Sequence, residues 1–442
     1  RDLLRASATT NATTLASPNA FGAGLINLDA ALTGAGSLTI VGSTTAGDRF
    51  ILGTATGFTG AINLQQGTLE ADPFVGTLGT ARNVSAINVT GDATLFGTTY
   101  GGIAVPVSVA AGKTATLKGI GLISQTLSGS GDLLVSDSTL TLGGTNTFSG
   151  NIRLAGGSLA ISATGNVANV AGVSVENNAS LTLTANAATL AAPITVAASK
   201  LLTLRGNRIL TLSGAISGDG AVRLDASAGA VFGATGTYHG DTTLDAGTAF
   251  LGANNAFGDG TLNLGYGSIS SDGTTARSLV NNVVVSADLV LGDQTKNGAL
   301  TFAGNVDLGG ARGLSANADI TFSGIVSNGA LTKTGDSIVT LAGANTYAGA
   351  TQVDWGVLAV SHAAGLGTAA AGTTVADGAE LRVLGGITVA SEAINVTGTG
   401  ISGNGAIRNF SGNNTLGGAI TLADATKIVA TAGKLTLTGG VT

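Results

Sequence analysis

One segment recurs four times along the chain, and this repetition constrains the fold more than any other feature. It is most complete at residues 339–360, VTLAGANTYAGATQVDWGVLAV, and degenerate copies occupy residues 140–161, 231–251 and 58–71. The aligned aromatic residues are 90, 90 and 109 residues apart, and a glycine follows each of them two positions later. Such repetition predicts a solenoid of stacked units rather than a set of globular domains. The aligned pairs are Phe58 with Gly60, Phe148 with Gly150, Tyr238 with Gly240, and Tyr347 with Gly349.

The composition favours a narrow core. Glycine accounts for 71 of the 442 residues, whereas charged residues make up 10% and aromatic residues 4% of the chain. So few large side chains cannot fill the wide interior of ordinary globular domains. The many short runs of Val, Leu, Ile and Ala can fill a thin, continuous core, as a solenoid requires.

From Gly34 onward the chain consists of short apolar strands at intervals of roughly 6–12 residues. Gly, Asn, Asp or Ser separate these strands, and no helical periodicity occurs after residue 33. Strands without helices between them cannot form βαβ units, but consecutive coils stacked in register can pair in parallel. The sequence therefore predicts an all-β fold, a right-handed parallel β-helix with roughly 20–25 residues per coil and on the order of 18 coils.

The first 33 residues follow a different pattern. RDLLRASA has helical spacing, a polar loop follows it, and Asn27 is placed to cap a final helical turn at residues 30–32. We therefore expect a helical and loop-like N-terminal cap over residues 1–33. A β-helix stalk over residues 34–442, built of roughly 90–110-residue modules, is expected to follow it. The abrupt start at Arg1 and the end within a repeat indicate a fragment or a processed product.

This N-terminal segment resembles the C-terminal end of a subtilisin-like protease domain. The residues that carry the likeness are the early LL pair and the later stretch FGAGLINLDAAL. The serine motif of that family is absent from this chain. The resemblance implies that a protease triad, if the parent protein has one, lies upstream of Arg1.

Composition argues against several classes of function. No uninterrupted apolar run reaches the ~18 residues of a membrane span. The net charge is −6 and the 19 basic residues are scattered singly, which disfavours nucleic-acid binding. Cysteine is absent, so we expect no disulfide and no thiolate metal site. No cofactor and no metal are predicted.

The side chains with catalytic potential form no recognisable constellation, so we predict no catalytic residue in this chain. His239 and His362 lack a second histidine at ligand spacing and a nucleophile motif. A glycan-cleaving β-helix stays an alternative if carboxylates face one groove. Trp355 interrupts the repeat pattern and suggests surface display, whereas the four repeat aromatics are expected to point inward. The carboxylate pairs considered are Glu70/Asp72, Asp132/Asp137 and Asp241/Asp245.

The most complete repeat resembles the passenger-associated transport repeat of bacterial autotransporters. The copy at residues 142–159 keeps Asn146, Thr147, Phe148 and Gly150 of the same pattern, and the other two copies are weaker. The resemblance implies a β-helical passenger that is exported through its own outer-membrane β-barrel translocator, a partner outside this sequence. The matching positions of the best copy are Leu341, Gly343, Asn345, Thr346, Tyr347, Gly349, Thr351, Val353, Gly356 and Leu358.

Three hypotheses for function follow. The first, implied by the resemblance, is a structural or adhesive scaffold that projects from the outer membrane of a Gram-negative bacterium, secreted or at the cell surface. Self-association and host- or cell-surface ligands are its expected further partners. The second is the non-catalytic stalk of a subtilisin-like protease. A serine-protease motif upstream of Arg1 would distinguish this hypothesis from the first. The third is a glycan-active β-helix enzyme.

Overall fold

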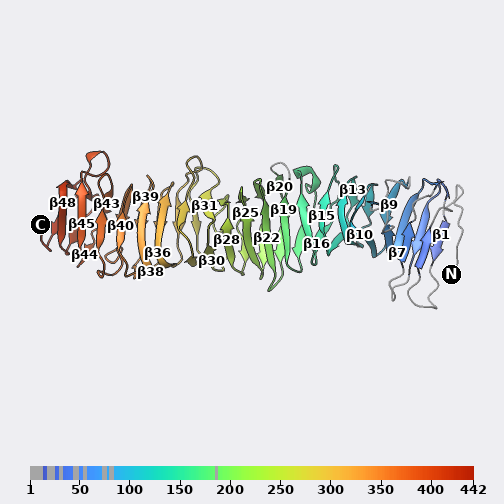
Figure 1. The fold of residues 1–442 in the computed structure, drawn as a ribbon, viewed down its shortest axis with the longest axis horizontal. Helices are drawn as coiled ribbons and strands as arrows, with labels where there is room; N and C mark the ends of the chain where they lie inside the picture. The colour runs from blue at the N-terminus through green and yellow to red at the C-terminus, as the bar shows by residue number, and fades with distance from the viewer. Residues whose placement is uncertain are drawn as a thin grey trace. The chain divides into compact units, whose positions relative to one another are not determined.

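The computed structural model describes residues 13–16, 25–28, 33–42, 49–52, 57–71, 77–78, 84–184 and 188–442. These residues form an all-β parallel solenoid of about 18 turns, which confirms the predicted parallel β-helix (Figure 1). Helical structure in the described part is limited to two single 3₁₀ turns, η1 (Thr164–Asn166) and η2 (Ile401–Gly403). No helix in this part is long and apolar enough to cross a membrane.

The chain divides into two compact units, residues 1–221 and 222–442. Among the described residues of the first unit the strands pair in parallel, each with its counterpart one coil further along the chain. One ladder contains β1 (Thr13–Ala16), β4 (Leu38–Val41), β7 (Ala61–Ala71), β9 (Ala86–Val89), β11 (Val107–Val109) and β13 (Leu127–Gly129). A second ladder contains β2 (Leu25–Leu28), β5 (Arg49–Leu52), β7, β10 (Ala93–Ile103), β12 (Thr114–Ile123), β14 (Asp132–Ser136), β16 (Asn151–Leu154), β18 (Gly172–Val175), β21 (Ile194–Val196) and β24 (Ile216–Gly218). A third contains β8 (Thr77–Leu78), β10, β12, β15 (Thr139–Leu142), β17 (Ser158–Ile161), β19 (Ala179–Leu183) and β22 (Leu201–Gly206). Two short pairs join β3 (Thr33–Gly34) to β6 (Gly57–Phe58) and β20 (Ala188–Leu190) to β23 (Leu210–Leu212).

The second unit repeats this arrangement. Its first ladder contains β25 (Ala221–Ala226), β28 (Thr242–Ala246), β30 (Leu262–Leu264), β33 (Val283–Val285), β36 (Val306–Ala316), β38 (Val326–Thr334), β40 (Thr351–Val353), β42 (Thr373–Val375), β45 (Ile394–Gly398) and β48 (Ile420–Thr426). Another contains β26 (Ala230–Phe232), β29 (Thr248–Leu251), β31 (Ser268–Ser271) and β34 (Leu289–Leu291), which continues into β36. A third contains β32 (Arg277–Leu279), β35 (Leu300–Phe302), β37 (Ile320–Phe322), β39 (Ile338–Leu341), β41 (Val357–Val360), β43 (Glu380–Val383), β46 (Ile407–Asn409) and β49 (Ile428–Ala430). The remaining strands are β27 (Thr237–Tyr238) and the ladder of β44 (Thr388–Val389), β47 (Asn414–Leu416) and β50 (Leu435–Leu437).

The core consists of aliphatic side chains stacked in columns along the coils. In β14 the residues alternate, so Leu133 and Val135 are buried while their neighbours face outward. Leu133 pairs with Ile152, which pairs with Val173 and then Ile194. Burial of each such side chain contributes about 1.5–3 kcal/mol to folding, so a narrow core is stabilised coil by coil.

The N-terminal segment differs from expectation at Asn27. Asn27 lies in β2 and pairs with Ile51 of β5, so it is not the cap of a helix. Parallel pairing with the next coil supplies the backbone hydrogen bonds of Leu25–Leu28, which explains why a strand forms there. The predicted helix at residues 1–8 and the helical turn at residues 30–32 lie outside the described residues. The boundary at residue 33 stays a prediction.

Candidate functional site

The four repeat aromatics all lie in the core. Phe58, Phe148, Tyr238 and Tyr347 are each at most 1% exposed. The two tyrosines therefore bring a hydroxyl group into an apolar interior, where an unpaired polar group is costly. Burial accordingly raises the pKa of both tyrosines well above the usual range.

The residue four positions after each aromatic matches it chemically. Tyr347 Oη lies 2.8 Å from Thr351 Oγ1, and Tyr238 Oη lies 2.5 Å from Thr242 Oγ1. Both threonines are buried. After Phe58 and Phe148, which carry no hydroxyl, the same position holds the buried residues Ile62 and Ile152. The repeat therefore occurs in two forms, a polar Tyr–Thr pair and an apolar Phe–Ile pair. In the first form each buried hydroxyl has a hydrogen-bond partner, and in the second form there is no hydroxyl to satisfy.

In three of the four copies the glycine that follows the aromatic has no room for a side chain. A Cβ atom at Gly60 would lie 1.9 Å from the carbonyl oxygen of Gly36, and one at Gly150 would lie 1.7 Å from that of Gly131. At Gly349 the corresponding distance to the Gly329 oxygen is 2.4 Å. In the third copy Gly240 is the contacted residue, because a Cβ atom at Gly260 would lie 2.2 Å from its oxygen. Close contact between coils therefore requires glycine at these corners.

A buried asparagine ties three successive coils together in two of the copies. Asn345 Oδ1 accepts a hydrogen bond from the Val326 N–H at 2.8 Å, and its Nδ2 donates to the Gly365 carbonyl at 2.6 Å. Asn146 forms the same pair of bonds with the Leu127 N–H and the Asn166 carbonyl, at 2.8 and 3.1 Å. The side chain thus links the preceding coil to the following one.

The comparison with known families matches these two copies. Residues 137–161 and 331–360 match the family described as the passenger-associated-transport-repeat. The chain carries passenger-associated transport repeats. Together with the solenoid, these transport repeats support an autotransporter passenger, which implies a translocator barrel in the full protein and a secreted or cell-surface location in a Gram-negative bacterium. No curated protein and no solved structure matches the chain.

The second transport repeat contains a buried lysine that sequence analysis missed. Lys333 is fully buried, and its Nζ donates to the carbonyl oxygens of Gly335 and Trp355. The equivalent inward position of the other three copies holds Ile40, Val135 or Leu224, as the strand register shows. Burial lowers the pKa of Lys333 to about 8. The sequence contained a signal, since Lys333 lies two residues after the buried Leu331 and therefore on the same, inward face of β38 (Val326–Thr334). The backbone at Gly356 lies so close that a Cβ atom there would be 2.4 Å from Lys333 Nζ.

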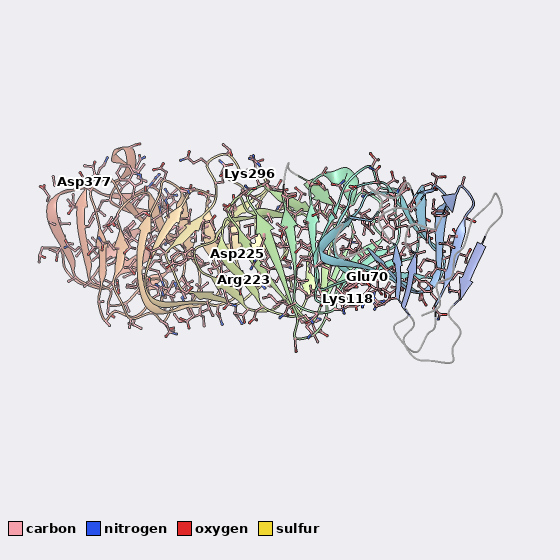
Figure 2. All side chains as sticks on the ribbon, turned by 45° about the vertical axis from the view of Figure 1, so that its right-hand side comes forward. Glu70, Lys118, Arg223, Asp225, Lys296 and Asp377 are labelled. Carbon is pink, nitrogen blue, oxygen red and sulfur yellow. The ribbon has the colours of Figure 1, made fainter. Side chains whose placement is uncertain are left out.

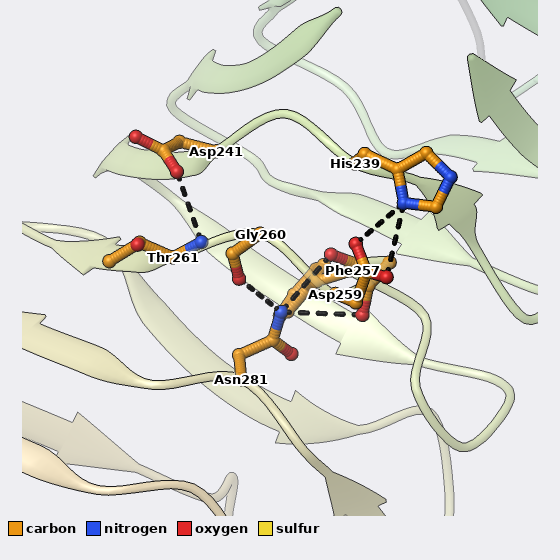
Figure 3. A network of polar contacts seen from close by, with 8 residues as sticks. His239, Asp241, Phe257, Asp259, Gly260, Thr261 and Asn281 are labelled. Carbon is orange, nitrogen blue, oxygen red and sulfur yellow. Dashed lines mark hydrogen bonds and ion pairs between the residues drawn. The ribbon is translucent and has the colours of Figure 1, made fainter. Parts of the chain in front are cut away.

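The two histidines lie in separate environments. His239 Nδ1 lies 2.9 Å from Asp259 Oδ1 on the next coil, and both side chains are 63% exposed (Figure 3). His362 Nδ1 accepts the Ala364 N–H, and its ring lines a hollow of about 280 Å³ together with Glu392. Glu392 is buried, accepts a bond from Thr373 Oγ1, and has a pKa raised by that burial. Within the described residues no group of three His, Cys, Asp or Glu side chains could hold a metal ion.

The carboxylates considered for glycan cleavage hold partners on neighbouring coils. Glu70, labelled in Figure 2, is buried and pairs with Arg49, whose Nε lies 2.6 Å away. The remaining four have structural partners as well, and Asp72 lies outside the described residues. Asp132 accepts from Asn151, Asp137 pairs with Lys118, Asp241 accepts the Thr261 N–H, and Asp245 pairs with Arg223. Each of these five carboxylates therefore has a partner on a neighbouring coil.

Proposed function

We propose that this chain is the stalk of an autotransporter passenger, a structural and adhesive scaffold that projects from the outer membrane. The observation that carries the proposal is the buried asparagine of the two transport repeats, which links three coils at once. A chain that crosses an outer membrane unfolded needs a fold that assembles locally. A solenoid provides this, because each coil contacts only its neighbours.

Side chains at the corners link each coil to the coil that follows it in the sequence. Asp132 and Asn178 accept the backbone N–H of Asn151 and Leu201, each one coil further along the chain. Asp319 does the same for the Ile338 N–H at 3.0 Å. A folded coil thus presents acceptors and an apolar surface on which its neighbour can fold. We infer that this stepwise stacking helps to draw the chain outward and then resists proteolysis.

The test is display on a cell. The chain is fused ahead of an outer-membrane translocator barrel and expressed in a Gram-negative host. An external epitope label and protease added to intact cells then report where the chain is. We expect surface label, a protease-resistant core, and binding of the displaying cells to one another or to a host-cell layer. A chain that stays in the periplasm overturns the stalk, and a displayed chain without cell binding overturns the adhesive part alone. The absence of catalytic residues stays a prediction.

A further inference from the structure

Trp355, the single tryptophan of the chain, is not required by the repeat that contains it. The position eight residues after the repeat aromatic holds Gln66, Gly156 or Ala246 in the other copies. Trp355 is 52% exposed. A large apolar ring that the fold does not need and that remains in contact with water is a candidate for recognition.

The corner around Trp355 holds the ring in place. The indole Nε1 donates to Asp336 Oδ1 at 2.5 Å, on the preceding coil. Lys333 Nζ, in the interior of the coil, donates to the Trp355 carbonyl at 2.9 Å. On the following coil the ring lies over Gly378, where a Cβ atom would be 3.5 Å from Trp355 Cζ3. Trp355 and Lys333 both replace smaller or apolar residues of the other copies, and they contact each other. The indole is therefore pre-organised, which lowers the entropic cost of binding.

The charges at this corner select the kind of ligand. Asp336 flanks the ring on the preceding coil, and Asp354, whose Oδ1 accepts the Gln352 amide, precedes the ring on its own coil. The carboxylate of Asp377, a residue labelled in Figure 2, lies against Gly398 one coil further on. The cation–π contacts found in the described part of the chain involve Phe96, Phe250 and Phe410, not Trp355. An indole ring with two carboxylates beside it attracts a cation to its open area through both the ring quadrupole and the charges.

We propose that the Trp355 corner binds a cationic side chain, arginine or lysine, of a partner polypeptide. The guanidinium or ammonium group lies against the ring, and the carboxylates of Asp336 and Asp354 accept its hydrogen bonds. This site goes beyond the proposed stalk, because cation binding can succeed or fail in the purified chain whether or not the chain is exported.

The experiment is a calorimetric titration of the purified full chain with acetyl-triarginine amide at low ionic strength, with acetyl-triglutamate amide as the matched probe. We expect saturable binding of triarginine only, and a change in the tryptophan emission that reports Trp355 alone. Trp355→Leu and Asp354→Asn should each weaken binding at least fivefold. Asp219→Asn, which removes an exposed turn carboxylate of the other unit, should change it less than twofold.

Circular dichroism checks that the variants fold. If Trp355→Leu does not fold, Asp354→Asn supplies the second test. Equal affinity of Trp355→Leu and the wild type would overturn the proposal, because binding would then follow net charge alone. Saturable binding of maltotriose without binding of triarginine would also overturn it and assign the ring to a carbohydrate.

Discussion

The hydroxyl oxygen of Tyr347 lies 2.8 Å from Oγ1 of Thr351, and both groups are buried. In the copies of the repeat that carry phenylalanine, isoleucine replaces this threonine. The hydroxyl groups therefore occur as a pair or not at all. Since a buried hydroxyl without a partner costs about 1–3 kcal/mol, the two positions should respond together to mutation.

Tyr347→Phe and Thr351→Val should each lower the free energy of unfolding by about 1–3 kcal/mol, because each leaves one buried hydroxyl unpaired. The double variant should recover most of this loss, as the natural Phe148 and Ile152 pair suggests. Urea unfolding followed by the emission of Trp355, four residues away, measures the effect locally. Strictly additive losses in the double variant would contradict the pairing.

Asn345→Ala should lower the free energy of unfolding of the surrounding coils by about 2–5 kcal/mol, because the Val326 N–H and the Gly365 carbonyl both lose their partner. Hydrogen exchange checks this directly, since the Val326 amide should lose protection. Asn404→Ala removes an exposed asparagine of the same unit and serves as the control. Unchanged protection of Val326 in Asn345→Ala would argue against a link between coils.

Gly150→Ala should destabilise its coil by about 1–3 kcal/mol or more, because the added Cβ would meet the Gly131 oxygen and the coils must separate. Gly165→Ala is the matched control in the same unit. It has open space around it and should be neutral or gain about 0.4–1 kcal/mol. Peptide-level hydrogen exchange distinguishes the two variants. Similar exchange in both would show that the tight corner is not important.

The stability of the second unit should rise with pH between about 8 and 10.5, the folded and ordinary pKa values of Lys333. In this range the unfolded chain binds the proton more tightly than the folded one, so raising the pH favours folding by up to about 3 kcal/mol. Lys333→Met removes the titrating group, and its stability should lack this rise. Urea midpoints at pH 7.5 and 10.5 provide the measurement. The same slope in both proteins would rule out Lys333 as its source.

The sequence was sufficient to predict the parallel solenoid, because apolar alternation at residues such as Leu133 and Val135 is local and repeats with every coil. The inward position of the repeat aromatics follows from the same pattern. The partners of Asn146 and Asn345 could not be predicted, because they depend on which residues of coils about 20 positions away come into register. Coil lengths vary with insertions at the corners, so this register is not encoded in any one copy.

Two features were predictable in principle and were missed. The threonine or isoleucine four residues after each aromatic is visible when the four copies are aligned. Lys333 lies on the inward face of its strand, two residues after Leu331. A charged residue is normally assigned to the outward face, and only the carbonyl groups around its ammonium explain why this one is buried. At Leu25–Leu28 the pattern is too short to separate a strand from a helical turn, and parallel pairing with β5 decides it.

The most direct test of the central claim, that the tightly stacked repeats make this chain an exported stalk, is surface display of the translocator fusion carrying Gly150→Ala and Gly349→Ala together. Display and protease resistance on intact cells are compared with those of the wild type and of Gly165→Ala. We predict that the double variant reaches the surface in smaller amounts and is degraded by external protease, whereas wild type and control form a resistant core. Equal display and equal resistance in all three chains would contradict the account.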